Sequence, residues 1–279
     1  MSGTLKKSKQ ALGRSLSNFG ITKSNLLIGK LRKQYWHAEP GSIVNYQNYR
    51  IRITDGPSFY TQCKDEFIHQ IYRFEANRSD PKIIDGGSNI GMSILYFKQL
   101  YPDASIVGFE PDPDIFKLLQ ENIAMNNLGN VTVVNAGLGA EDGTATFIAD
   151  HSAGGRVASG ENSIEVKIRR LSSSINGRID FLKLNIEGEE LPVLCELEAT
   201  GRLSYVEQLV LEYHGWPEGD QRLGKILDLL ARNNFRYLVH DFDAETGDAT
   251  KPPFSWTPDK IWYCLVYAKN LSANLDANR

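Results

Sequence analysis

One segment near residue 90 constrains the fold more than any other part of the chain. Residues 82–85 form a short apolar run that ends in an acid, and two glycines follow it directly. From residue 93 onward the apolar pattern becomes helical. A strand that passes through glycines into a helix lets a ligand approach bare backbone, because glycine has no Cβ and tolerates positive φ. The segment predicts a strand–loop–helix unit that binds a ligand.

The spacing of the glycines indicates which ligand this loop binds. A dinucleotide-binding loop carries G-x-G-x-x-G, whereas this loop reads D-x-G-x-x-x-G from Asp85 to Gly91. The spacing argues against a nicotinamide cofactor and favours S-adenosylmethionine. We expect Asp85 and the loop backbone to hold the methionine part of that cofactor. The expected loop contacts are Gly86, Gly87, Ser88, Asn89 and Gly91.

Strands and helices alternate after this unit, as they do in a doubly wound α/β fold. The expected core strands are 82–85, 105–109, 131–135, 181–186 and 208–213. The expected helices are 93–100, 115–123, 191–197 and 221–233. Two last strands, at 235–241 and 261–268, are expected to pair antiparallel at one edge. The pattern predicts a mostly parallel sheet.

Other segments depart from this alternation. Residues 43–53 predict a strand or hairpin ahead of the core, and residues 64–76 predict a helix leading into the first core strand. Gly137–Gly139 predicts a glycine-rich turn. Residues 144–149 and 164–169 predict two strands of an insertion or sheet extension near the active face.

Polar side chains end every expected core strand. In an open α/β sheet, ligands bind beyond the carboxyl ends of the strands, so these groups are expected to meet in one crevice. The residues are Asp85, Glu110, Asn135, Asn185 with Glu187, and Glu212 with His214.

Glu110 is the expected partner of the adenosine. A carboxylate at the end of the second strand can accept both ribose hydroxyls, a placement that dinucleotide sites share. Asp112 either caps the next helix or contacts the cofactor. The expected cofactor site also takes in Pro111, Asn135, Ala136, Gly137 and Asn185.

The charge of the chain is divided unevenly. Its net charge is −3, yet residues 1–36 contain lysine and arginine and no acid, so the remainder is strongly acidic. An acidic body argues against nucleic acid as the main substrate. The basic arm has three interpretations: a solvated leader or packed helix, a segment that caps substrate or forms a homo-oligomer, and a helix on a membrane surface.

The apolar run at 26–28 is too short for a signal peptide or a membrane span. Three scattered cysteines favour a reducing compartment, so we expect a cytoplasmic protein. Two domains are expected: an arm, hairpin and lead-in helix over 1–78, and a cofactor-binding domain over 79–279. The arm, residues 60–64 and the 150–160 loop are expected to cover the substrate pocket.

Four segments together resemble the FkbM family of S-adenosylmethionine-dependent methyltransferases. They are IIDGGSNIGMS (83–93), VGFEPDPDIFKLLQENIAMNNLGNVTVVNAGLG (107–139), DFLKLNIEGEELPVL (180–194) and VLEYHG (210–215). The resemblance covers roughly 80–240, and its most specific part is the block from Lys183 to Glu190. It implies a class I, Rossmann-like sheet of seven strands and methyl transfer, usually to oxygen, on sugars and natural-product hydroxyls. The family usually has Asp where this chain has Asn185.

A hydroxyl acceptor must lose its proton as the methyl group arrives. His214 is the first candidate base, since an ordinary histidine titrates near 6.5. Strand alternation places Glu212 on the same side as His214, where it can orient the imidazole. Glu187 is the alternative base, and Glu190 is expected only to pair with a base such as Lys183.

The Glu, Asn and His side chains also suit Mg²⁺, but Asn185 replaces a carboxylate there and no metal site is predicted. The leading interpretation is an O-methyltransferase that acts on a saccharide or secondary metabolite. The alternatives are an RNA methyltransferase, a cofactor-binding module without transferase activity and, last, a nicotinamide oxidoreductase.

Overall fold

The computed structural model describes residues 23–148, 156–157, 163–217, 219–240 and 261–272. Residues 1–22 of the predicted arm and most of the predicted 150–160 cover lie outside them. The described residues divide into two compact units: 23–42 with Ile53–Ile71, and Ile43–Arg52 with the described residues from Tyr72 on. The predicted boundary at residue 78 stays a prediction. No helix in the described residues is long and apolar enough to cross a membrane.

Three helical segments make up the described first unit: α2 (Lys23–Tyr35), α3 (Gly56–Gln62) and the π-helix η1 (Cys63–His69). Asp55 caps α3, because its Oδ1 accepts the Ser58 N–H at 2.8 Å. The helix predicted over 64–76 is wrong beyond His69. Gln70 takes a left-handed φ of 57° and ends the helical run. Ile71, Tyr72 and Phe74 are buried without forming a helix.

The second unit begins with the predicted hairpin, β1 (Ile43–Tyr46) paired antiparallel with β2 (Tyr49–Arg52). Side-chain amides of the helix α5 (Pro113–Met125) bind the backbone of β2. Asn122 accepts from the Arg52 N–H and donates to the Arg52 carbonyl, and Asn126, directly after the helix, does the same at Arg50. The hairpin is thereby joined to the helix that follows the second core strand.

Seven strands form the main sheet, in the order β12-β13-β11-β10-β3-β4-β5. In chain order they are β3 (Lys82–Gly86), β4 (Ser105–Phe109), β5 (Val131–Val134), β10 (Ile179–Leu184), β11 (Val206–Gly215), β12 (Phe235–His240) and β13 (Trp262–Asn270). β13 runs antiparallel to both of its neighbours, β11 and β12, and the remaining pairs of neighbouring strands are parallel. The chain moves outward from β3 to β5 and then returns to β10 beside β3, so the switch point lies between β3 and β10. The predicted class I Rossmann-like fold is confirmed.

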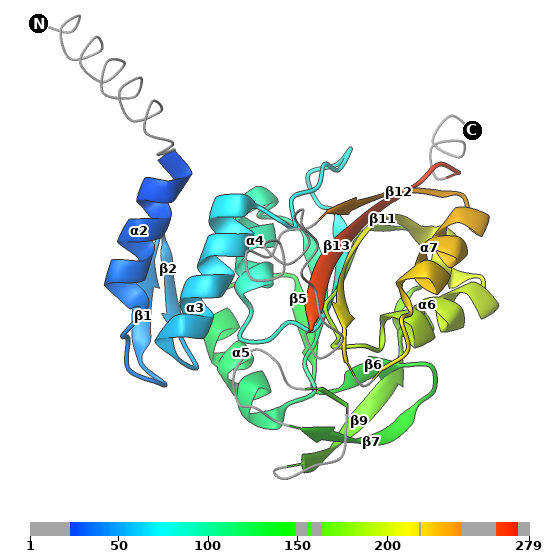
Figure 1. The fold of residues 1–279 in the computed structure, drawn as a ribbon. Coiled ribbons are helices and arrows are strands. Elements are labelled where there is room, and N and C mark those ends of the chain that lie inside the picture. The colour runs from blue at the N-terminus through cyan, green and yellow to red at the C-terminus, as the bar shows by residue number, and fades with distance from the viewer. Residues whose placement is uncertain (1–22, 149–155, 158–162, 218, 241–260, 273–279) are drawn as a thin grey trace, which may run out of the picture. The chain divides into compact units, whose positions relative to one another are not determined.

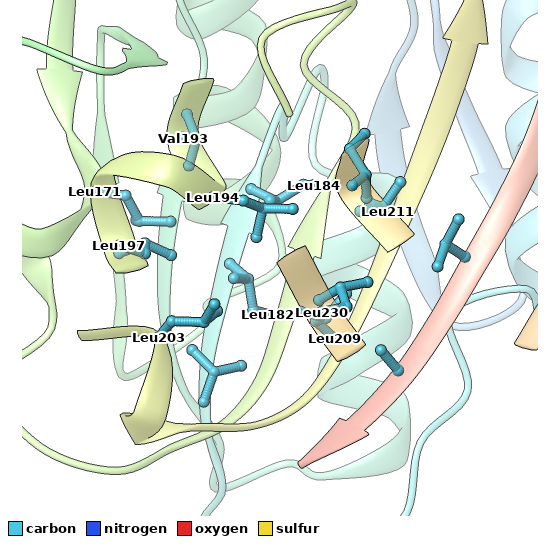
Figure 2. Packing of buried hydrophobic residues seen from close by; sticks show 14 of the residues in the cluster. Leu171, Leu182, Leu184, Val193, Leu194, Leu197, Leu203, Leu209, Leu211 and Leu230 are labelled. Atoms are coloured by element: carbon cyan, nitrogen blue, oxygen red, sulfur yellow. The ribbon is translucent and has the colours of Figure 1, made fainter. Parts of the chain in front are cut away.

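Helices cover both faces of this sheet (Figure 1). The pair α4 (Met92–Leu100) and α5 lies on one face, and α6 (Glu190–Ala199) with α7 (Leu223–Arg232) lies on the other. Figure 2 shows the second interface, where leucines of β10 and β11 meet α6 and α7. Every residue of β10 is buried, as expected for a parallel strand covered on both faces. Two short 3₁₀ segments, η2 (Leu171–Ser174) and η3 (Arg202–Tyr205), complete this side.

A second, smaller sheet has the order β6-β9-β7-β8. Its strands are β6 (Gly137–Gly139), β7 (Gly143–Ile148), β8 (Arg156–Val157) and β9 (Ser163–Arg170). The two strands predicted here are present, but the turn predicted at Gly137–Gly139 is wrong, because these residues pair with β9 as a strand. Ile168 explains the glycines: a Cβ on Gly139 would lie 2.7 Å from its side chain.

Candidate active site

The glycine loop after β3 packs closely against the neighbouring strands. The N–H groups of Gly87 and Ser88 both donate to the Phe109 carbonyl of β4, at 3.0 and 2.8 Å. Gly87 has a φ of +80°, and a Cβ there would lie 1.9 Å from the Asn185 carbonyl oxygen. The loop can therefore occupy this position only with glycine, and its backbone is left uncovered by a side chain.

Asp85 stabilises the loop through buried contacts to Ser93 and Lys183. It is fully buried, its Oδ2 accepts the Ser93 hydroxyl at 2.6 Å, and its Oδ1 lies 3.0 Å from Lys183 Nζ. Lys183 Nζ also donates to the Gly87 carbonyl at 2.6 Å. The sequence pattern did not indicate this lysine as part of the site. The expected direct contact between Asp85 and the cofactor stays a prediction.

Glu110 connects the loop to the end of β4. Its Oε2 accepts the Asn89 N–H and its Oε1 accepts the Asp112 N–H, both at 2.9 Å. Burial raises the pKa of Glu110 to about 7. Each oxygen keeps a second lone pair, so the carboxylate can still accept a pair of hydroxyls. Asp112 caps α5, one of the two roles expected for it, and accepts the N–H of Asp114 at 2.8 Å. The expected contact with the cofactor stays a prediction.

The end of β5 is joined to the same place. Asn135 Nδ2 donates to the carbonyls of Glu110 and Pro111, at 2.9 and 3.0 Å. Ala136 is buried beside it, and Gly137 opens the small sheet. The structure thus brings together the expected groups at the ends of β3, β4 and β5.

His214 lies inside β11 and not at the start of a loop. The strand was predicted to stop at residue 213, but it extends to Gly215 because β13 pairs with it through the whole of this end. The His214 side chain is only 4% exposed. Burial lowers its pKa to about 4. The imidazole is therefore neutral near pH 7.

Two carboxylates lie near one nitrogen of this imidazole. His214 Nε2 lies 3.4 Å from Glu187 Oε2 and 3.7 Å from Glu212 Oε1. The three residues named as catalytic by the sequence are therefore one cluster. Tyr263 packs its ring edge-on against the imidazole, with centroids 4.9 Å apart, which restricts how the imidazole can turn.

A hydrogen-bond network holds Glu212 in place. Its Oε2 accepts from Asn185 Nδ2 at 3.1 Å and from the Tyr72 hydroxyl at 3.2 Å. Asn185 also touches the cofactor loop, since its N–H donates to the Gly86 carbonyl at 3.0 Å. Its Oδ1 is buried and accepts no hydrogen bond from the described residues. Asn185 therefore links the glycine loop to the His214 cluster and offers one open acceptor between them.

Glu190 has a different role from the predicted pairing with Lys183. Its carboxylate accepts hydrogen bonds from the N–H groups of Ile186 and Gly188, and the shortest distance to each is 3.1 Å. Lys183 instead pairs with Asp85. Burial raises the pKa of Glu190 to about 7. The loop that it closes holds Glu187 at a φ of +57°. Such strained positions are found at functional sites, and this one directs Glu187 toward His214.

These features fit S-adenosylmethionine. Glu110 offers two carboxylate oxygens for a ribose diol, the Gly87 backbone approaches without a Cβ, and the Asn185 Oδ1 is an open acceptor for a donor group of the methionine part. No group of three or more His, Cys, Asp or Glu within the described ranges has the arrangement of a metal site.

Comparisons with known proteins identify the family of the chain. Residues 85–237 match the model of the methyltransferase FkbM domain. Methyltransferase sdnD of Sordaria araneosa is 30% identical over 71% of this chain and 85% of its own. Methyltransferase 1 of Beauveria bassiana (strain ARSEF 2860) is 29% identical over 53% of this chain and 75% of its own length.

Among solved structures, methyltransferase FkbM from Methylobacillus flagellatus KT is similar over 72% of this chain and 46% of its own, with 18% identity and a TM-score of 0.46. The family model spans more than half of this chain. The chain belongs to the FkbM family of S-adenosylmethionine-dependent methyltransferases.

Proposed function

We propose that this methyltransferase methylates a hydroxyl oxygen of a small molecule, either a saccharide or a secondary metabolite. The proposal rests on the imidazole of His214, which lies near the carboxylates of Glu187 and Glu212. An alkyl hydroxyl is a poor nucleophile until its proton is removed, and a neutral imidazole beside two carboxylates is suited to take that proton. A single residue, Asn185, links the His214 cluster to the glycine loop, because it donates hydrogen bonds to both Glu212 and the Gly86 carbonyl.

S-adenosylmethionine supplies an electrophilic methyl group on sulfur. As the acceptor oxygen forms its bond to the methyl carbon, the carbon–sulfur bond breaks, and the products are the methyl ether and S-adenosylhomocysteine. The hydroxyl proton passes to His214. Glu187 and Glu212 stabilise the resulting imidazolium by their negative charge. Asn185 and Tyr72 keep Glu212 in position for this task.

A direct assay tests the proposal. The protein is incubated with S-adenosylmethionine labelled in its methyl group and with three acceptor pools: hydroxylated small molecules, small-molecule amines and RNA. We expect label in the hydroxylated pool, one S-adenosylhomocysteine per methyl group transferred, and a methyl carbon shift typical of an ether in the product. Label in RNA would contradict the proposal. Tight binding of S-adenosylhomocysteine with no transfer to any pool would favour a binding module.

Cofactor affinity should depend on pH through Glu110. Its carboxylate accepts two ribose hydroxyls only when ionised, and its pKa in the free protein is about 7. Affinity for S-adenosylhomocysteine should therefore be full above pH 8 and fall up to about tenfold per unit as the pH drops below 7. Isothermal titration calorimetry between pH 5.5 and 8.5 measures this slope.

The matched variant is Glu110→Gln. It should bind more weakly than the unaltered protein above pH 7 and show a flat profile, so that the two affinities converge as the pH falls. Glu141→Gln, at an exposed position, should leave the profile unchanged. A slope that persists in Glu110→Gln would assign the proton to another group, such as Glu190, whose pKa is also about 7.

A further inference from the structure

The exposed side of helix α2 carries both lysines and leucines. Residues three or four apart on a helix share a face. Five exposed residues of α2, dark blue in Figure 1, are spaced in this way and form what we call the basic face: Lys23, Leu26, Leu27, Lys30 and Lys33. The two leucines are large apolar side chains left in solvent, with Leu26 42% exposed and Leu27 54% exposed.

The opposite side of α2 attaches the helix to its own unit. Leu31 and Tyr35 are buried. The ring of Tyr35 meets Phe59 of α3 edge-on, with centroids 5.1 Å apart. These contacts hold the helix in place by its other side, so the exposed leucines are not needed for packing within the unit. The basic face is therefore available to a partner.

The positive charge of the basic face is not neutralised by nearby carboxylates. Residues 1–36 contain no acid, and none of the ion pairs among the described residues includes a lysine of this face. Two acids of the same unit are engaged elsewhere, since Asp55 caps α3 and Asp65 pairs with Lys64. The lysines can therefore attract an anionic partner.

The leucines indicate which anionic partner fits. Nucleic acid would be bound by the lysines through its phosphates, and Leu26 and Leu27 would contribute nothing to that contact. A bilayer surface uses both kinds of side chain. Anionic headgroups attract the lysines, while the leucines enter the boundary between headgroups and acyl chains. The long apolar stems of the lysines let their ammonium groups stay among the headgroups.

The sequence ahead of α2 adds to this charge. Residues 1–22 contain four further basic residues: Lys6, Lys7, Lys9 and Arg14. Clusters of about four to eight basic residues on or beside an amphipathic helix are typical of binding to anionic lipids. The length of α2 agrees with a surface position, because it has 13 residues, whereas a membrane-spanning helix needs about 20.

We propose that the basic face of α2 docks this methyltransferase on the surface of an anionic lipid bilayer. The helix lies along the surface, with its lysines at the headgroups and its two leucines inserted below them. This docking is independent of which acceptor the enzyme methylates.

Co-sedimentation of the full chain with lipid vesicles tests the docking. We expect binding to vesicles of phosphatidylcholine with about 30% phosphatidylserine, and at least about tenfold weaker binding to phosphatidylcholine alone. Because salt screens exposed charges, about 0.5 M NaCl should remove most of this difference. Absence of binding to the phosphatidylserine vesicles would overturn the proposal.

Replacing the three lysines of the basic face with glutamine should weaken this binding about 100-fold, since each lysine near an anionic surface contributes roughly fivefold. The matched control has the same net charge and replaces three exposed lysines of other elements. Its substitutions are Lys117→Gln, Lys167→Gln and Lys225→Gln. The control should bind as the unaltered protein does, and equal losses in the two triple variants would reduce the effect to net charge and refute the face.

The leucines are tested at constant charge. Leu26→Gln with Leu27→Gln should weaken vesicle binding at least about tenfold, because their apolar surface no longer leaves water. Leu238→Gln with Leu271→Gln, two exposed leucines elsewhere, should have no effect. Unchanged thermal unfolding and affinity for S-adenosylhomocysteine should show that all variants fold. Normal vesicle binding by the first pair would contradict insertion. RNA binding or self-association that the lysine variant abolishes, without vesicle binding, would assign the face to another partner.

Discussion

Replacing Gly87 with alanine should weaken the binding of S-adenosylhomocysteine about 100-fold and lower the melting temperature. The residue has a φ of +80°, and the new Cβ would lie 1.9 Å from the Asn185 carbonyl oxygen, which belongs to the backbone and cannot rotate away. Strain in the left-handed region alone costs about 1–3 kcal/mol. About 1.4 kcal/mol corresponds to a tenfold change in affinity. A displaced loop that costs about twice that free energy on binding therefore accounts for the expected loss of about 100-fold.

Gly129→Ala is the matched control. Nothing lies within 4 Å of the position that its Cβ would take, and its φ is not in the left-handed region. Calorimetric titration and thermal unfolding of the two variants should therefore distinguish the effect of replacing any glycine from the effect of displacing the loop at Gly87. Normal affinity in Gly87→Ala would show that the loop does not carry the cofactor.

The sheet and the polar strand ends could be predicted because both follow from local patterns. Apolar runs of strand length alternate with helical periodicity, and parallel strands end at one edge of their sheet. Glu110 and Asn135 were found in this way, and the structure joins them by a hydrogen bond from Asn135 to the Glu110 carbonyl. The choice of these residues needed no knowledge of strand register.

Register explains what the sequence could not predict. Lys183 lies opposite Asp85 in the pairing of β10 with β3. A strand that is buried on both faces has no alternating pattern to fix its offset, so this ion pair cannot be read from the chain. Tyr72 was missed for a related reason: its hydroxyl meets Glu212, 140 residues away, from a segment whose apolar spacing looked helical.

The extent of β11 was also underestimated. Gly215 ends the strand where Trp262 of β13 crosses it, and a Cβ on Gly215 would overlap the indole. Pairing with a strand close to fifty residues later therefore extends β11 past His214. That pairing buries the imidazole and lowers its pKa to about 4. A histidine predicted to follow the strand is in fact a buried, neutral residue within it.

His214→Ala should lower kcat by roughly 10²–10⁴-fold, the usual contribution of a general base, with little change in affinity for S-adenosylhomocysteine. The pH profile of the unaltered protein gives a second readout. A base acts only when unprotonated, so activity should be kept above its pKa and lost as the pH falls through it. Because burial places that pKa at about 4 and not near 6.5, the acid limb of kcat/KM for the acceptor, measured at saturating S-adenosylmethionine, should lie well below pH 6.

His240→Ala is the control, since this histidine is exposed on β12 and outside the cluster. Glu187→Gln tests the neighbouring carboxylate: it should lower kcat less than the loss of the imidazole does. If the two groups act as one unit, the double variant should be no slower than His214→Ala alone. Independent, multiplicative losses would mean that Glu187 contacts the acceptor by itself. Unchanged turnover in His214→Ala across pH would remove the proposed base and leave Glu187 as the group that takes the proton.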